Sequence, residues 1–362
     1  MMLKYCIFAL IFIANPLFAN CDFKTGDFIS ELNDPQSLRK ISVRIPKSAS
    51  WEKNFLRIIA KRSKNIPPSL RKKYFAHITA HYEFGECSFK GKVWQNGDWK
   101  DHIEFANGKP LRSINVKLDE GNIVNSTRFK LLIPATRNDF NEVFAVSVLS
   151  ASGFLTPKTF KVQTDVNGTR SLMLFQEDAR KELLERNGRR EGPMFEGDES
   201  LLWADGRIIN DNISLARLLN DKWAMRGVNS LKMSLRAAKA LQVAYVYRAN
   251  NMNFYGNFLD PNNFVDLEAN SSEKFSSYHF ILQSIGAEHA LIPHNRKFYF
   301  NALENMFEPI YYDGNVFQDR HTSFEKATIQ NAYRGFDVIQ YSEKILSQEI
   351  KSTAKSIFES HV

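Results

Sequence analysis

Two polar side chains in the stretch Gly286–Asn315 have the chemistry and spacing of a magnesium site. Asn295 comes shortly before the apolar run Phe298–Phe300, and Asp313 directly follows a second apolar run, Pro309–Tyr312. A carboxylate oxygen and an amide oxygen suit a hard cation that keeps several waters and bridges phosphates. The alternative is an ordinary hairpin, because Asp-Gly is a strong turn signal between strands. Asn295 and Asp313 are therefore the candidate metal ligands.

The elements that must position this pair follow from the hydrophobic pattern. Residues Tyr74 to Gln163 contain short alternating runs separated by Gly, Asn and Asp, which predict β-strands. Apolar residues at helical spacing predict one inserted helix over Asn138–Ser152. Asn167-Gly168 predicts a hairpin between two further strands. After Asp178 the pattern becomes mainly helical, so the chain reads as an α+β protein.

The order and spacing of several segments between residues 87 and 316 resemble the CotH family, spore-coat-type kinases with an atypical protein-kinase fold that use ATP and magnesium. The segments that carry the resemblance are WQNGD (94–98), SINVKL (113–118), FKLLIP (129–134), FKVQTDVNG (160–168), LMLFQED (172–178), PHNRKFYF (293–300) and PIYYDGN (309–315).

The resemblance implies an α+β, atypical protein-kinase-like two-lobed fold. The N-terminal lobe would be strand-rich with one inserted helix, and the C-terminal lobe would be mainly helical. The expected divisions are a signal peptide over residues 1–19, an N-terminal extension with a basic helix over 20–73, a nucleotide-binding lobe over 74–178, and a helical lobe with the metal-site hairpin over 179–362.

The resemblance also implies how a nucleotide would be held. The turn at Asn96 and Gly97 would lie over the phosphates, where glycine lets backbone N–H groups approach closely. Lys117 matches the family's phosphate-binding lysine, and Lys130 is the rival for that role. Glu142 on the inserted helix would pair with the lysine. Taken singly, each of these charges also fits an ordinary surface position.

On the same resemblance, Glu177 would lie on the adenine side, and Asn295 and Asp313 would bind the metal ion. Kinases of this kind carry an Asp several residues before the Asn, to orient the acceptor hydroxyl and take its proton. The segment that precedes Asn295 contains no Asp. Glu288 and His289 stand there instead and are the candidate catalytic residues.

Two functions follow from these residues. The first is an exported CotH-like kinase that transfers phosphate from ATP, with Mg²⁺, to a hydroxyl of a protein or glycan acceptor at the cell surface. The second is a catalytically silent kinase-like module that binds a cell-surface partner or glycan, with the absent Asp as its signature.

The N-terminus has the order of an export signal. Lys4 supplies the positive start, an apolar run follows, and Ala19 offers a small residue for cleavage. The run is too short to span a bilayer as a mature helix, so no transmembrane helix is expected in the mature chain. We expect the protein in the periplasm, at the cell surface or secreted.

The cysteines are consistent with an oxidising compartment. Of the three, Cys6 lies in the expected signal, which leaves Cys21 and Cys87. These two are expected to pair. The alternatives are two separate thiols, or a lipid anchor on Cys21, which stands next to the expected cleavage site.

The charge of the chain is modestly basic, with a formal net charge of +8 over 362 residues. Much of the excess lies in Lys53–Lys73. Such a run is commonly a solvated helix face, and otherwise a contact for an anionic glycan, phospholipid headgroup or phosphorylated partner. No aromatic-interleaved basic motif indicates nucleic acid, so no nucleic-acid partner is expected.

We expect cleavage near Ala19 during export from the native host. N-terminal sequencing and intact-mass measurement of the mature protein check this directly. A mature protein that still begins at Met1 would rule the signal out.

Overall fold

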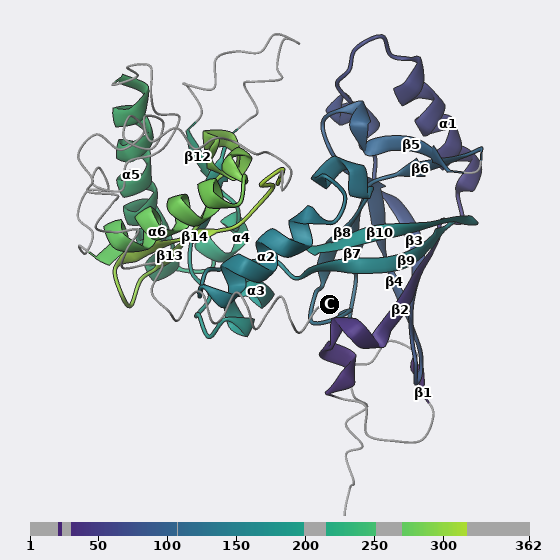
Figure 1. Ribbon diagram of the computed structural model, residues 1–362, viewed down its shortest axis with the longest axis horizontal. Helices are drawn as coiled ribbons and strands as arrows, with labels where there is room; N and C mark the ends of the chain where they lie inside the picture. Colours follow the sequence, from purple (N-terminus) through teal and green to yellow (C-terminus); the bar gives the residue numbers. More distant parts are fainter. Residues whose placement is uncertain (1–20, 24–29, 107, 199–214, 251–269, 317–362) are drawn as a thin grey trace, which may run out of the picture.

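The computed structural model describes residues 21–23, 30–106, 108–198, 215–250 and 270–316. The expected signal, residues 1–19, lies outside this part of the chain. The described residues form a large sheet and a smaller sheet with helices beside them. Figure 1 shows the large sheet at the right of the view and the smaller one at the left.

Seven strands of the large sheet close into a barrel. They follow the order β4-β3-β2-β9-β10-β8-β7, and β7 pairs back to β4. Only the β2–β9 pair in this ring is parallel. The barrel strands are β2 (Leu38–Arg44), β3 (Tyr74–Tyr82), β4 (Gly85–Gln95), β7 (Ile114–Leu118), β8 (Arg128–Leu132), β9 (Thr159–Val166) and β10 (Thr169–Glu177).

The barrel strands form where the sequence alternates. Along β3 every second residue, from Tyr74 to Tyr82, is buried, which is the pattern of a strand with one face on a core. Phe129 stacks on Phe175 in that core, with ring centroids 4.5 Å apart. Asn167 and Gly168 both have positive φ, 49° and 83°, and connect β9 to β10. The predicted hairpin is confirmed.

The smaller sheet has the order β12-β11-β13-β14. Its strands are β11 (Met194–Gly197), β12 (Ala216–Leu218), β13 (Lys297–Asn301) and β14 (Met306–Ile310). Helices α5 (Val228–Asn250) and α6 (Asn270–Ser284) pack on it. Phe298, Phe300 and Phe307 from the sheet share one apolar cluster with Leu241 and Phe275 from these helices.

The remaining elements are α1 (Ser48–Ala60), α2 (Asn141–Ala151), α3 (Lys181–Arg186), α4 (Asp221–Ala224), the strand β1 (Cys21–Phe23) on the outer part of β4, and the two-stranded ribbon of β5 (Ile103–Ala106) and β6 (Lys109–Arg112). The helix predicted over Asn138–Ser152 is confirmed as α2. It begins later because Asn138 and Asp139 both have positive φ, which no α-helix accommodates.

The prediction of an atypical protein-kinase-like two-lobed α+β fold is wrong. Seven strands within residues 38–177 form a closed barrel, and the following part is built on a second sheet with few helices rather than being mainly helical. The described chain contains six α-helices in all. The physical reason is long-range pairing: β7 returns to β4, and β2 inserts beside β9. Residues 20–73, expected as an extension, thus supply a barrel strand.

The barrel and the smaller sheet meet beside α2, which lies between them in Figure 1. Leu155, just after α2, forms a β-bridge with Ile310 at the end of β14. The backbone N–H of Tyr311 donates to the carbonyl of Leu155 at 2.8 Å. The chain that leaves β14 is therefore held against the segment that leaves α2.

The predicted Cys21–Cys87 disulfide is confirmed, and it joins β1 to β4 across paired positions. Because the Cys21 sulfur is used in this bond, it is not available for a thioether, and the lipid anchor considered for Cys21 is incompatible with the structure. None of the helices in the described ranges has the length and apolar character needed to cross a bilayer.

Replacing both Cys21 and Cys87 by Ser should lower the free energy of unfolding by roughly 4 kcal/mol, because the cross-link closes a long loop in the unfolded chain. Urea unfolding of the wild type and the double variant, each with and without reductant, measures this. Reductant should destabilise only the wild type. Equal stability of both proteins in the absence of reductant would contradict the expectation.

Candidate functional site

Two lysines converge on the ring of Tyr312, where the barrel meets the end of β14. Lys130 on β8 is 8% exposed, and its Nζ donates to the Tyr312 hydroxyl at 3.3 Å. The Nζ atoms of Lys130 and of Lys297 on β13 each lie 4.3 Å from the ring centroid. A phenol ring attracts cations through its π-face, so Tyr312 contacts two ammonium groups. We call this arrangement the Tyr312 cluster.

Arg137 and Asp313 form an ion pair next to Tyr312. The Arg137 Nη1 lies 3.3 Å from the Asp313 Oδ1, and both side chains are largely buried. Burial by itself lowers the pKa of Arg137, but the negative charge of Asp313, together with other nearby groups that include Glu142, more than offsets this and the pKa is raised. Arg137 comes from a 3-10 turn, Pro134–Arg137, which follows β8. The pair therefore joins the barrel to the segment after β14.

The carboxylates around the two lysines already take part in ion pairs. Asp178 forms ion pairs with two arginines: its Oδ2 lies 3.0 Å from the Arg128 Nε and 3.2 Å from the Arg180 Nε. Burial raises the pKa of Asp178, but the charges of Lys130 and these arginines outweigh it and the pKa is lowered. Lys297 pairs with Glu196 on β11. For Lys130, burial lowers the pKa, and the charge of Asp178 offsets this only in part.

Glu142 makes different contacts from those expected of it. Its Oε1 accepts from Gln176 at 3.1 Å and its Oε2 accepts from the Tyr311 hydroxyl at 2.8 Å. The Tyr311 hydroxyl in turn accepts from the Gly314 backbone N–H at 3.2 Å. Burial raises the pKa of Glu142. Glu142 thus braces the chain around Tyr311 and does not form an ion pair with Lys130.

The turn at Asn96 and Gly97 packs against His102. The Asn96 backbone N–H donates to the Ser113 carbonyl at 2.9 Å. A Cβ on Gly97, whose φ is 82°, would lie 1.8 Å from the His102 ring, so only glycine fits. Burial and the nearby charge of Arg137 lower the pKa of His102 to about 3, which leaves it neutral. The turn therefore lies near the Arg137–Asp313 pair.

Two other candidates point away from the cluster. Lys117 on β7 is exposed, and its strand partner is Arg128. Glu177 accepts from the Lys158 backbone N–H at 2.9 Å and from Arg186 Nη2 at 2.5 Å. Its carboxylate thus ties β10 to α3. Of the two rival lysines, Lys130 is the one at the Tyr312 cluster.

Asn295, Glu288 and His289 lie on the short 3-10 turns before β13. The Asn295 Nδ2 donates to the His289 carbonyl at 3.1 Å, and Glu288 is exposed. In the described ranges no contact joins Asn295 to Asp313, and no group of three or more His, Cys, Asp and Glu side chains comes together. Asp313 is consequently the candidate metal ligand that belongs to the cluster.

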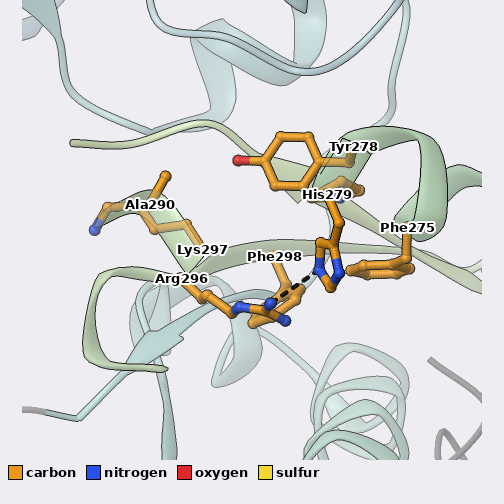
Figure 2. Close-up of a pocket in the computed structure, with 8 residues that line it drawn as sticks. Phe275, Tyr278, His279, Ala290, Arg296, Lys297 and Phe298 are labelled. Atoms are coloured by element: carbon orange, nitrogen blue, oxygen red, sulfur yellow. Dashed lines mark hydrogen bonds between the residues drawn. The ribbon is translucent and has the colours of Figure 1, made fainter. Parts of the chain in front are cut away.

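Lys297 also lines a small cavity, together with residues of α6 and β13. Figure 2 shows His279 and Arg296 on its wall, with the Arg296 Nη2 2.8 Å from the His279 Nε2. Burial lowers the pKa of His279, so it accepts this hydrogen bond as neutral imidazole. The cavity volume is about 10 Å³, which suits about one water molecule. It is too small for a substrate.

Sequence reasoning did not single out Arg137, Tyr312 or Lys297. Arg137 had one usable signal, since it stands between a strand and the inserted helix, where a turn can direct its side chain inward. Lys297 begins the apolar run after Asn295, and Tyr312 ends the run before Asp313. The chain matches no known family model, and no curated protein matches it.

Asp313→Asn should lower the free energy of unfolding by about 3 kcal/mol, because it leaves the buried Arg137 guanidinium without its counter-charge. Combining it with Arg137→Met in a double-mutant cycle should recover part of the loss. Urea unfolding gives all four values. Glu185→Gln is the control, since its exposed pair with Lys181 should cost less than about 1 kcal/mol. An Asp313→Asn cost as small as the control's would contradict the role of the pair.

Proposed function

We propose that the Tyr312 cluster binds the phosphates of ATP together with Mg²⁺, and that the protein transfers phosphate to a hydroxyl of a surface protein or glycan. The observation that carries the proposal is the state of Lys130. Its ammonium is buried, and in the described part of the chain no carboxylate lies within ion-pair distance of it; the phenol of Tyr312 is its contact. An anionic ligand would stabilise a buried ammonium that lacks a counter-ion.

The neighbours of Lys130 support a polyanionic ligand rather than a single carboxylate. The Lys297 Nζ lies 4.3 Å from the Tyr312 ring centroid, as the Lys130 Nζ does, and the Arg137 guanidinium lies 6.0 Å from it. Three cations from β8, β13 and the turn after β8 therefore surround one aromatic side chain. Such a spacing of charges suits several phosphate oxygens better than one small anion.

The residues present fit a magnesium ion held mainly by its ligand. Mg²⁺ is commonly bound through one or two carboxylates plus substrate phosphates and waters, so Asp313 alone can hold it. Its carboxylate is partly exposed and is shared with Arg137. When bound, the ion would neutralise charge on the phosphates. Lys130 and Lys297 would orient the phosphates, and Arg137 would stabilise negative charge that develops on them.

The acceptor side of the proposal rests on Glu288 and His289. Both lie on the 3-10 turn that precedes Asn295, and Glu288 is exposed to solvent, where an acceptor hydroxyl can reach it. Either would orient the hydroxyl and take its proton. The resemblance to the CotH family supports the same reaction, although the fold it implied is not the one adopted.

The second candidate is a module that binds a surface partner without catalysis. Two observations favour it: the segment before Asn295 lacks an Asp, and Arg137 already occupies the Asp313 carboxylate. The kinase requires binding of ATP with magnesium and also phosphate transfer, whereas the silent module requires neither.

Lys130→Met should weaken binding of ATP with Mg²⁺ by about thirtyfold, since a charge-assisted contact of about 2 kcal/mol is lost. Isothermal titration calorimetry measures the Kd. Lys117→Met is the matched control, because it removes the same charge from the neighbouring strand at an exposed position. Its Kd should equal that of the wild type.

Phosphate transfer is measured with γ-labelled ATP as donor and the surface fraction of the host as the source of acceptors. Glu288→Gln or His289→Ala should lower the labelling rate while sparing the Kd for ATP. Binding without labelling would favour the silent module. Wild-type protein with no affinity for ATP and magnesium, or equal losses from Lys130→Met and Lys117→Met, would overturn the proposal.

A further inference from the structure

A second surface of the molecule combines exposed apolar side chains with exposed bases. Leu56 on α1 is 63% exposed, and Phe105 on β5 is 64% exposed. Ile59 on α1 and Trp99 before β5 are also exposed. Transfer of apolar side chains of this size from water to an apolar phase is favourable. We call Leu56, Ile59, Trp99 and Phe105 the α1 patch.

The residues of the α1 patch lie on one continuous surface. The Phe105 ring contacts Phe55 of α1 edge-on, with centroids 5.7 Å apart. The Lys100 Nζ donates to the Ile59 carbonyl at 3.3 Å, and Asn65 forms a β-bridge with Trp99. These contacts fix the ribbon of β5 and β6 against α1 and the loop after it. In Figure 1 this region lies at the upper end of the barrel, away from the second sheet.

The patch is bordered by positive charge. Residues 51–66 and 99–106 contain six bases and three acids. The exposed bases of the first segment are Lys53, Arg57, Lys61, Arg62 and Lys64. They follow the outer side of α1 and the loop directly after it, next to Leu56 and Ile59. The surface therefore presents apolar groups beside a run of cations on α1 and the loop after it.

We propose that the α1 patch docks on an anionic phospholipid surface. The main apolar face of α1, with Trp51, Phe55 and Ile58, is buried, and the helix leaves Leu56 and Ile59 exposed beside Lys and Arg. Apolar side chains next to bases on a helix are the pattern of segments that lie in the plane of a membrane interface. The cations would meet acidic headgroups, and Leu56, Ile59 and Phe105 would enter the boundary with the acyl chains. A soluble polyanion would satisfy the bases alone and would leave these apolar side chains in water. This docking is independent of the proposed phosphate-transfer site.

The test uses the purified mature protein with its disulfide intact and vesicles of phosphatidylcholine alone or of equal parts phosphatidylcholine and phosphatidylglycerol. Co-sedimentation should show binding to the anionic vesicles only, and added salt should weaken it. Lys61→Glu with Arg62→Glu should reduce partitioning about tenfold or more. Leu56→Ser with Phe105→Ser should reduce it by a similar factor at low salt.

The matched control is Leu235→Ser on α5, which is also about 60% exposed and lies close in sequence to Lys232 and Arg236. It should leave partitioning unchanged. Absence of vesicle binding would overturn the proposal, and so would equal binding to both vesicle types. Loss with the charge variants but not with Leu56→Ser and Phe105→Ser would assign the surface to a soluble or glycan polyanion instead. All substituted side chains are exposed, and circular dichroism confirms that each variant is folded.

Discussion

Three consecutive residues after β14 are each held by a different buried group from the barrel side, and this connection fixes the two parts of the molecule together. Tyr311 donates to Glu142, Tyr312 accepts from Lys130, and Asp313 pairs with Arg137. Removing water from so many charges costs free energy unless each finds a partner. The positions of β8, α2 and the turn between them are therefore constrained by the chain that leaves β14.

The same connection sets the electrostatics of the candidate site. Arg137 and Asp313 compensate one another, whereas Lys130 has a phenol as its direct contact. Burial disfavours the charged forms of both Lys130 and Glu142, so it lowers the pKa of Lys130 and raises that of Glu142. An anionic ligand would relieve the first without disturbing the second, because Glu142 faces Tyr311 and Gln176.

Local patterns in the sequence predicted the local structure well. The alternating runs gave six of the seven barrel strands but missed β2, which lies in the segment expected as an extension. The helical spacing gave α2, and Asn167-Gly168 gave the hairpin between β9 and β10. Barrel closure could not be read in this way, since it depends on pairings between distant segments. The site was predictable only in part, for a related reason. Lys130 and Asp313 were candidates from the sequence pattern around each of them. Arg137 and Lys297 reach the cluster only through tertiary packing. Asn295 was also a candidate, but its side chain donates to the His289 carbonyl.

The pKa of the Lys130 ammonium, followed by NMR with ¹⁵N-labelled lysine, tests the central claim most directly. The account predicts a pKa below that of an exposed lysine in the free protein. It predicts a rise when ATP and Mg²⁺ are added, because nearby phosphates favour the charged form. Adenosine should cause no rise. A Lys130 pKa that does not change when ATP and magnesium are added in excess would contradict a phosphate-binding role for the Tyr312 cluster.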